Sequence, residues 1–283
     1  MRMFYKFLRF DLKHGLVKEW KKFLVALCAF LAFFLIYYLC VFAENRNLLA
    51  QGEEPLEFTF MDLILSVLGG MKEFHYEDGE MFLFPAVWIF FFLLLLFYTL
   101  RYPIQNLDGM GRSMLILSQN RRVWWYSKCV WCCVYVFVYF LLLYILAFLM
   151  GICLGGKLSF QPSEYAPYAL DAGMYIKNPP WNLAPGVLLV PLVACAISML
   201  QMVLTLWVKP IFAYVLSCVL LLSSAYFANP AFVGNYAMLF RTDIFAEEGF
   251  PLGWGFTAAA LLIILSLLIG YFRMENMDIL NRE

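Results

Sequence analysis

The sequence is poor in charged residues. Asp, Glu, Lys and Arg make up 14% of its 283 residues, whereas soluble domains average about 25%. Hydrophobic residues reach 64% and aromatic residues 19%. This composition excludes an ordinary soluble domain and predicts a protein embedded in a membrane.

Charged residues and histidine are absent from six long apolar runs. The runs are 23–42, 81–100, 129–150, 183–208, 211–228 and 252–272. Each is close to the about 20 residues that a helix needs to cross the hydrocarbon core. The runs lack the alternation of barrel strands, and a backbone in lipid must satisfy its own hydrogen bonds. The predicted fold is therefore all-α, with residues 1–283 forming one polytopic membrane domain of six transmembrane helices.

Motifs for autonomous catalysis are also lacking. The two histidines, His14 and His75, lie outside the runs, so an intramembrane H-E-x-x-H zinc site cannot form. The pair Gly155–Gly156 precedes Lys157, but Leu158 follows where a phosphate-binding loop needs Ser or Thr. We expect no catalytic residue, metal or cofactor on this chain, which is not an enzyme by itself. The absence of ionisable groups in the runs also disfavours ion-coupled transport.

The eight cysteines lie in or beside the apolar runs rather than in external loops. This placement predicts small packing residues rather than disulfides. Three of them, Cys129, Cys132 and Cys133, are spaced like part of a metal site. We expect no further His or Cys at the same depth, so packing is the favoured interpretation.

Basic residues divide unequally between the two sides of the predicted bundle. Fifteen of the 20 Lys and Arg residues lie in the N-terminus, the connection 101–128, the turn at Lys209 and the C-terminus. The positive-inside bias therefore predicts a multi-pass protein of the cell membrane with both termini in the cytoplasm.

The first 22 residues predict an amphipathic helix in the cytoplasmic interface. Its cations share one stripe, and they are Arg2, Lys6, Arg9 and Lys13. The helix is expected to bend at Gly15. Asp11 interrupts the apolar side, and we expect it to pair with a cation or a helix N-terminus. Either a plain membrane anchor or a partner contact fits this helix.

The external segments predict short caps on the bundle. Residues 57–71 are apolar but too short to span, which indicates a helix on or dipping into the outer leaflet. The stretch 73–80 gathers acids without a defined cation-binding spacing, so a solvated acidic turn is favoured. Residues 229–245 predict a second outer cap.

The connection 101–128 contains a short, partly apolar helix predicted over 112–118. Gly109 and Gly111 allow a sharp turn before it, and its apolar positions are Met114, Leu115 and Leu117. Such a helix at the cytosolic surface favours docking in a partner's groove. The following cations and aromatics, Arg121, Arg122, Trp124, Trp125, Tyr126 and Lys128, fit an ordinary topogenic cluster and aromatic belt equally well.

This layout resembles the six-span, type-two permeases of ABC-type exporters. Their connection between spans 2 and 3 carries a coupling helix that docks on a separate ATPase. The matching positions are Asp108, Gly109, Leu115, Leu117, Ser118, Arg121 and Lys128, and Gly111, Arg112, Met114 and Arg122 lie in the same segment. The short outer helix ending at Gly69 and Gly70 is similar as well. Asn120 departs from the family pattern, where Pro or Ser is often seen.

The resemblance implies a soluble ABC ATPase partner that binds ATP and Mg, a second copy or a paralogue of the permease, and no nucleic acid. It places spans 2 and 5 along a substrate pathway, and the candidate lining residues are Trp88, Phe92, Tyr214, Ser217, Ser223 and Ser224. Helix packing is the alternative role for these six. A pathway without charges favours a hydrophobic or amphipathic substrate, with peptides ahead of lipids and drugs. A sensor or scaffold, a secondary carrier, and an immunity or accessory permease remain open.

Overall fold

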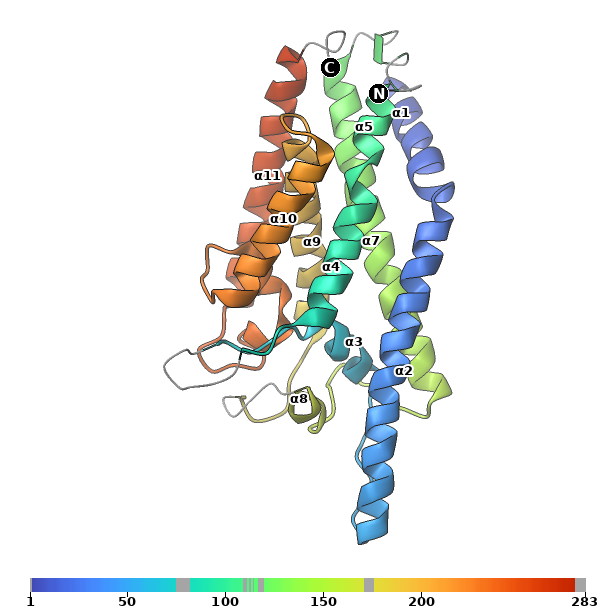
Figure 1. Cartoon of the computed structure of the whole chain (residues 1–283), viewed down its shortest axis with the longest axis vertical. Coiled ribbons are helices and arrows are strands. Elements are labelled where there is room, and N and C mark those ends of the chain that lie inside the picture. The colour runs from blue at the N-terminus through green and yellow to red at the C-terminus, as the bar shows by residue number, and fades with distance from the viewer. Residues whose placement is uncertain are drawn as a thin grey trace.

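The computed structural model is a bundle of helices that run roughly side by side (Figure 1). It describes residues 2–74, 82–108, 111, 113, 115–116, 120–170 and 176–277. The elements are α1 Arg2–Leu12, the π-helix η1 Lys13–Val17, α2 Trp20–Gln51, α3 Phe60–Leu68, α4 Ala86–Leu100, α5 Tyr102–Asp108, α7 Arg121–Cys153, α8 Ala166–Ala169, α9 Ala184–Leu204, α10 Pro210–Tyr226, the 3-10 helices η3 Val233–Ala237 and η4 Leu239–Arg241, and α11 Leu252–Asn276. The all-α prediction is confirmed for these residues.

Among the residues that the structure describes, five helices are long and apolar enough to cross a membrane. They are α2, α7, α9, α11 and the continuous stretch Ala86–Gln105 that joins α4 to α5. The run 211–228 forms α10, which has 17 residues and a length of about 26 Å, against the roughly 30 Å of a hydrocarbon core. The chain is thus a multi-pass membrane protein with five membrane-length helices, and the six-span count is not established.

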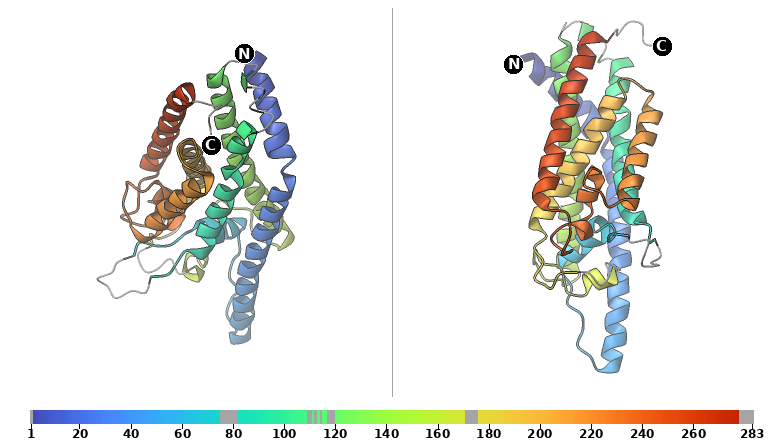
Figure 2. Two further views of the ribbon diagram at one scale, coloured as in Figure 1. Left: turned by 45° about the horizontal axis from the view of Figure 1, so that its top comes forward. Right: turned by 90° about the vertical axis from the view of Figure 1, so that its left-hand side faces the viewer.

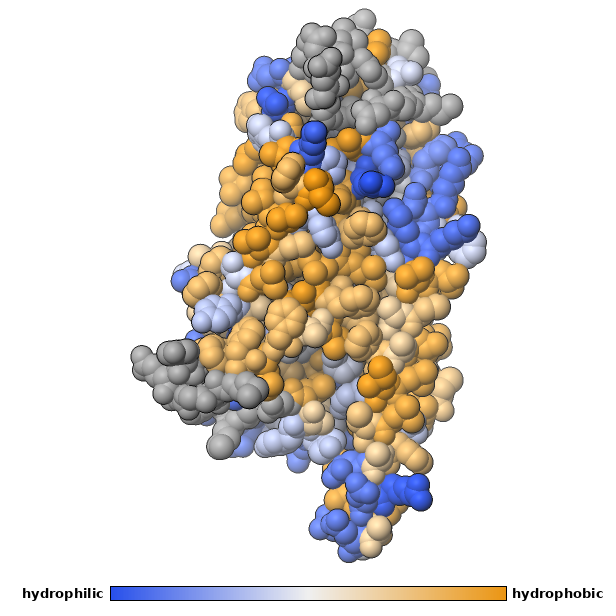
Figure 3. All heavy atoms as spheres, viewed as in Figure 1, coloured by the Kyte–Doolittle hydropathy of each residue, from blue (hydrophilic) through white to orange (hydrophobic). Residues whose placement is uncertain are grey.

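Helix α9 lies at the centre of the bundle, and α2 and α11 lie at its edges. In the most apolar window of α9, 72% of the residues are buried, against 17% in α11. The start of α1 and the end of α11 lie at the same end of the molecule, and α2 projects beyond the other end (Figures 1 and 2). Apolar side chains cover the middle of the visible surface, and polar ones gather toward both ends (Figure 3). This banding is the pattern expected for lipid contact.

The break predicted at Gly15 is present as the π-helical turn η1, which separates α1 from α2. A Cβ atom at Gly15 would lie 2.5 Å from both the Trp131 indole nitrogen and a Tyr102 ring carbon. Glycine is therefore required for α1 to approach α7 and α5 this closely. The π-turn is one of the usual causes of a helix bend.

The segments predicted to lie on the outer side pack into the protein more deeply than expected. Eight of the nine residues of α3 are buried, and the helix contacts α2, α4 and α7. The prediction of a helix on the outer leaflet is wrong in this respect, because an all-round apolar helix is also suited to a protein interior. The predicted cap at 229–245 is present, with η3 and η4 packed inside it. Most of the acidic stretch 73–80 lies outside the described residues.

Candidate functional site

Four polar side chains meet in a buried cluster at the end of the bundle that holds the start of α1. Asp11 of α1 forms an ion pair with Lys128 of α7. Its carboxylate also accepts hydrogen bonds from the Ser127 hydroxyl and, at 3.0 Å, from the Tyr102 hydroxyl of α5. We call Asp11, Tyr102, Ser127 and Lys128 the polar joint, because it ties α1, α5 and α7 together.

The polar joint is sealed from solvent by aromatic rings. Asp11, Ser127 and Lys128 are each 0% exposed. The Lys128 ammonium lies 4.7 Å from the Tyr102 ring centroid and 5.2 Å from that of Trp124, distances at which a ring face attracts a cation. The expectation that Asp11 pairs with a cation is confirmed. Lys128 is enclosed and paired within the chain, and its assignment to ATPase coupling stays a prediction.

Two further cations of the connection, Arg121 and Arg122, bind the end of α11. Arg121 donates from Nη1 to the carbonyls of Glu275 at 3.0 Å and Met277 at 2.7 Å. Arg122 forms a 2.6 Å ion pair with the Glu275 carboxylate and lies 5.1 Å from the Tyr271 ring centroid. Cations suit this position because the last carbonyls of a helix lack partners and carry partial negative charge. The start of α7 is thereby tied to the end of α11.

The predicted coupling helix is described only in part. Asp108 ends α5, and Gly111, Leu115 and Ile116 are described. The predicted residues Gly109, Arg112, Met114, Leu117 and Ser118 lie outside the described residues. Leu115 is 2% exposed and belongs to the chain's own core, so the expectation that it faces a partner is wrong. Ile116, which was not a candidate, is 53% exposed.

The cationic stripe of α1 faces outward as predicted. Lys6, Arg9 and Lys13 are exposed, whereas Phe7 and Asp11 are buried and α1 packs on α7. Arg2 begins the helix. The helix is therefore anchored to the bundle by contacts of its own and does not depend on lipid alone.

The six candidate pathway residues lie on α4 and α10, which contact each other. Trp88 and Phe92 are 2% exposed, and the Trp88 indole donates to the Ala237 carbonyl at 2.9 Å. Tyr214 donates its hydroxyl to the Leu93 carbonyl at 3.2 Å. The Ser217 hydroxyl donates to the Ala213 carbonyl, and the Ser224 hydroxyl donates to the Leu220 carbonyl. The Ser223 carbonyl accepts a hydrogen bond from the Phe227 amide. Four of these side chains, those of Trp88, Tyr214, Ser217 and Ser224, thus bond within the protein, and Phe92 packs its ring 4.6 Å from that of Trp88. A substrate-lining role for the six residues stays a prediction.

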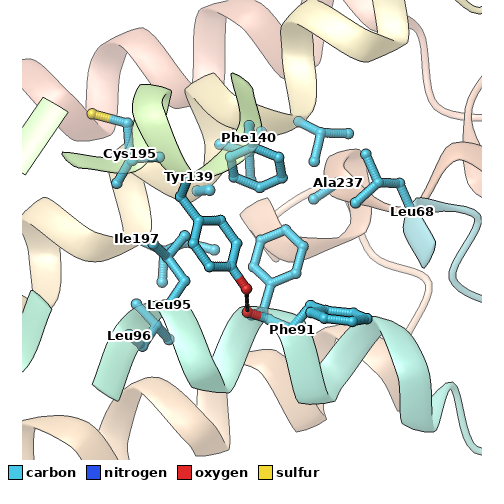
Figure 4. Packing of buried hydrophobic residues seen from close by; sticks show 14 of the residues in the cluster. Leu68, Phe91, Leu95, Leu96, Tyr139, Phe140, Cys195, Ile197 and Ala237 are labelled. Atoms are coloured by element: carbon cyan, nitrogen blue, oxygen red, sulfur yellow. Dashed lines mark hydrogen bonds between the residues drawn. The ribbon is translucent and has the colours of Figure 1, made fainter. Parts of the chain in front are cut away.

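The core beside α4 is built from tightly packed aromatic and aliphatic side chains (Figure 4). Tyr139 of α7 points into it, is 1% exposed and donates its hydroxyl to the Phe91 carbonyl at 3.1 Å. Phe30 of α2 packs with its ring centroid 4.6 Å from that of Phe91. These contacts hold α2, α4 and α7 as one unit next to the candidate pathway.

At the opposite end, Arg241 of η4 caps α10. Its guanidinium donates to the carbonyls of Ser224 and Ala225, both at 2.6 Å, and to the Asn235 side chain at 2.5 Å. Burial lowers the Arg241 pKa to about 10, and the negative charge of Glu73 partly opposes this shift. Arg241 was not among the predicted site residues, although a lone arginine within the apolar strip 229–245 is a usable signal for a buried cap.

Asp62 anchors the start of α3. Its two carboxylate oxygens accept from the backbone amides of Thr59 and Ser163, each at 2.8 Å. Burial raises the Asp62 pKa above its usual value, and these hydrogen bonds partly oppose the shift. This carboxylate joins α3 to the loop before α8.

Two cysteines come together in the interior. The sulfur atoms of Cys133 on α7 and Cys195 on α9 lie 3.1 Å apart. The expectation that no further cysteine lies at the depth of Cys133 is therefore wrong. Within the described residues, no group of three or more His, Cys, Asp and Glu is arranged to hold a metal ion.

A protein-family model with the description "Protein of unknown function (DUF2705)" matches residues 23–280. The chain belongs to the DUF2705 family. The match includes all five membrane-length helices except the first residues of α2, and α1 lies ahead of it. Searches of curated proteins and of solved structures found no match. An ABC permease identity is named by none of these comparisons and is argued below as a proposal.

Proposed function

We propose that this DUF2705 protein is the transmembrane subunit of an ATP-driven exporter of the ABC type. It works with a soluble ATPase and forms its pathway with a second copy or a paralogue. Its substrate is hydrophobic or amphipathic, and a peptide is the first class to test. An immunity or accessory role and the export of lipids or drugs are variants of the same pumping activity.

The polar joint is the observation that carries this proposal. The connection 101–128 begins at α5, where Tyr102 bonds to Asp11 of α1. It ends at the start of α7, where Arg121 bonds to the end of α11. A force applied to this connection would therefore reach α1, α7 and α11 through defined polar contacts, and α4 through the continuous stretch Ala86–Gln105. A buried ion pair adds little net stability, which favours a role in fixing geometry.

The distribution of charge supports an external energy source. In the part of the chain that the structure describes, every charged residue of the membrane-length helices lies within about two turns of a helix end. Ion-coupled carriers use ionisable groups near the membrane midplane. Hydrolysis of ATP by a partner supplies the work without such groups.

Co-purification tests the proposal directly. The wild-type chain is solubilised in detergent from the cells that produce it, and bound proteins are identified by mass spectrometry. Ile116→Asp places a charge on the exposed apolar side chain of the connection, and Leu49→Asp is the matched control, since Leu49 is 60% exposed on the distal end of α2. We expect a soluble ATPase to co-purify with the wild type and with Leu49→Asp, and to be absent from the Ile116→Asp sample.

Recovery of the wild-type chain alone or with signalling proteins would contradict the proposal and favour the sensor or scaffold alternative. Equal retention of the ATPase by Ile116→Asp and Leu49→Asp would contradict the docking position at Ile116 while supporting the ATPase partnership. Size-exclusion profiles of both variants show that the bundle remains folded.

A further inference from the structure

Two free thiols from different helices lie against each other deep in the bundle. Cys133 lies 12 residues into α7, about 18 Å along the helix axis, and Cys195 lies 11 residues into the 21-residue α9. Both are free cysteines, Cys195 being 1% exposed and Cys133 partly exposed. Their sulfur atoms are 3.1 Å apart. The pair is thus central in the membrane-spanning region and open on the Cys133 side.

The local geometry singles out this pair among the cysteines of the region. An S–S bond is about 2.05 Å long, so the two sulfurs need to approach by roughly 1 Å. Cys129 and Cys132 precede Cys133 on α7 and are buried, whereas the close contact between two cysteine sulfurs joins Cys133 to Cys195. Met199, one turn after Cys195, places its sulfur 3.8 Å from that of Cys133. Sulfur atoms therefore line this one contact between α7 and α9.

We propose that Cys133 and Cys195 form a reversible, oxidation-dependent cross-link between α7 and α9. The oxidant is a membrane-soluble two-electron acceptor of the quinone or diazene class. Two S–H bonds break and one S–S bond forms, while two electrons and two protons pass to the oxidant, which becomes a quinol or a hydrazine. A dithiol reductant reverses the reaction by thiol–disulfide exchange.

The surroundings of the pair determine which oxidants can reach it. Apolar helix faces enclose Cys195, and charged molecules pay a large desolvation cost on entering such a region. A small uncharged oxidant can approach from the partly exposed face of Cys133. The pair therefore discriminates between oxidants dissolved in the membrane and charged oxidants such as oxidised glutathione.

The cross-link joins residues that are 62 positions apart and holds α7 against the central α9. Because α7 also carries the polar joint, the cross-link would restrain the helix through which the proposed ATPase acts. The formation of the bond requires no ATPase. Its test is consequently separate from the test of the proposed function.

The wild-type chain in lipid nanodiscs is treated with diamide or, separately, with oxidised glutathione. Remaining thiols are blocked with N-ethylmaleimide, and the chain is digested without reductant for mass spectrometry. Diamide is expected to produce one peptide pair linked through Cys133 and Cys195, and dithiothreitol to remove it. Oxidised glutathione is expected to leave both thiols available for labelling.

Matched variants control for reactions at other cysteines. Cys132→Ser should cross-link as the wild type does, whereas Cys195→Ser should leave Cys133 free for labelling. The proposal is overturned if diamide leaves Cys133 and Cys195 unlinked in the wild type, or links them mainly to other cysteines. The decisive measurement uses the unaltered protein, so a poorly folded variant does not affect it.

Discussion

Replacement of Lys128 by methionine tests the polar joint most directly. Lys128→Met keeps most of the side-chain volume and removes the ammonium, which leaves the Asp11 carboxylate buried at 0% exposure. Loss of one partner from a buried ion pair costs about 3–5 kcal/mol. Asp11 would retain hydrogen bonds from Ser127 and Tyr102, which continue to stabilise the charge. We therefore expect a cost near the lower bound, about 3 kcal/mol.

The double variant Asp11→Leu/Lys128→Met removes both charges of the ion pair and so tests whether the cost of Lys128→Met comes from the unpaired Asp11 carboxylate. With both charges gone, no charge is stranded, and an apolar replacement of a buried ion pair is often neutral. The Ser127 hydroxyl would lose its acceptor, at about 1 kcal/mol, and Tyr102 would lose the carboxylate but keep the backbone carbonyl of residue 11 at 3.3 Å. We expect the double variant to be destabilised by about 1–2 kcal/mol, less than Lys128→Met alone.

The assay is reversible unfolding in mixed micelles, followed by the fluorescence of tryptophans such as Trp124 and Trp131, which are fully buried around the joint. Lys157→Met is the matched control, because Lys157 pairs with Glu57 on the surface, where the side chains are 63% and 66% exposed. An exposed pair contributes at most about 1 kcal/mol. If Lys128→Met costs no more than Lys157→Met, the polar joint does not stabilise the contact of α1 with α7, and the reasoning fails.

Three further predictions concern other contacts. Gly270→Ala should cost about 1–3 kcal/mol, because its Cβ would lie 1.9 Å from a ring carbon of Trp125, whereas Gly253→Ala on the same helix meets nothing within 4 Å and should be neutral in the same unfolding assay. Arg241→Met should cost about 3 kcal/mol, because the carbonyls at the end of α10 lose their donor. Amide hydrogen exchange at the end of α10 should then be faster in the variant than in the wild type, and slower exchange would contradict this. The raised pKa of Asp62 means that the folded state holds this proton more tightly than the unfolded state, so the stabilisation should be lost as pH rises from about 4, the ordinary pKa of an Asp carboxyl, through the raised pKa of the folded state. Thermal midpoints measured across that range should lose this pH dependence in Asp62→Asn, and an unchanged slope would refute the assignment.

The sequence by itself was sufficient for the class of the protein and for most helix positions. Long runs without charged residues indicate segments that lie in the membrane, because a charged side chain at membrane depth is costly. The break at Gly15 was also predictable, because a glycine after an amphipathic helix is a local signal. The length of α10 was overestimated, because apolar residues continue past its end into the loop after Tyr226 and hydropathy does not mark where a helix stops.

The partners within the site depended on contacts between distant residues. Asp11 and Lys128 are 117 positions apart, and Cys133 and Cys195 are 62 apart. The pattern of one segment can show that a side chain needs a partner, as it did for Asp11. Which residue becomes that partner depends on which helix faces pack against each other. The burial of Leu115 likewise follows from the packing around it. Composition and periodicity therefore determined that this chain is a helical membrane protein, and only the tertiary packing of α1, α7, α9 and α11 decided which of its polar and thiol groups act together.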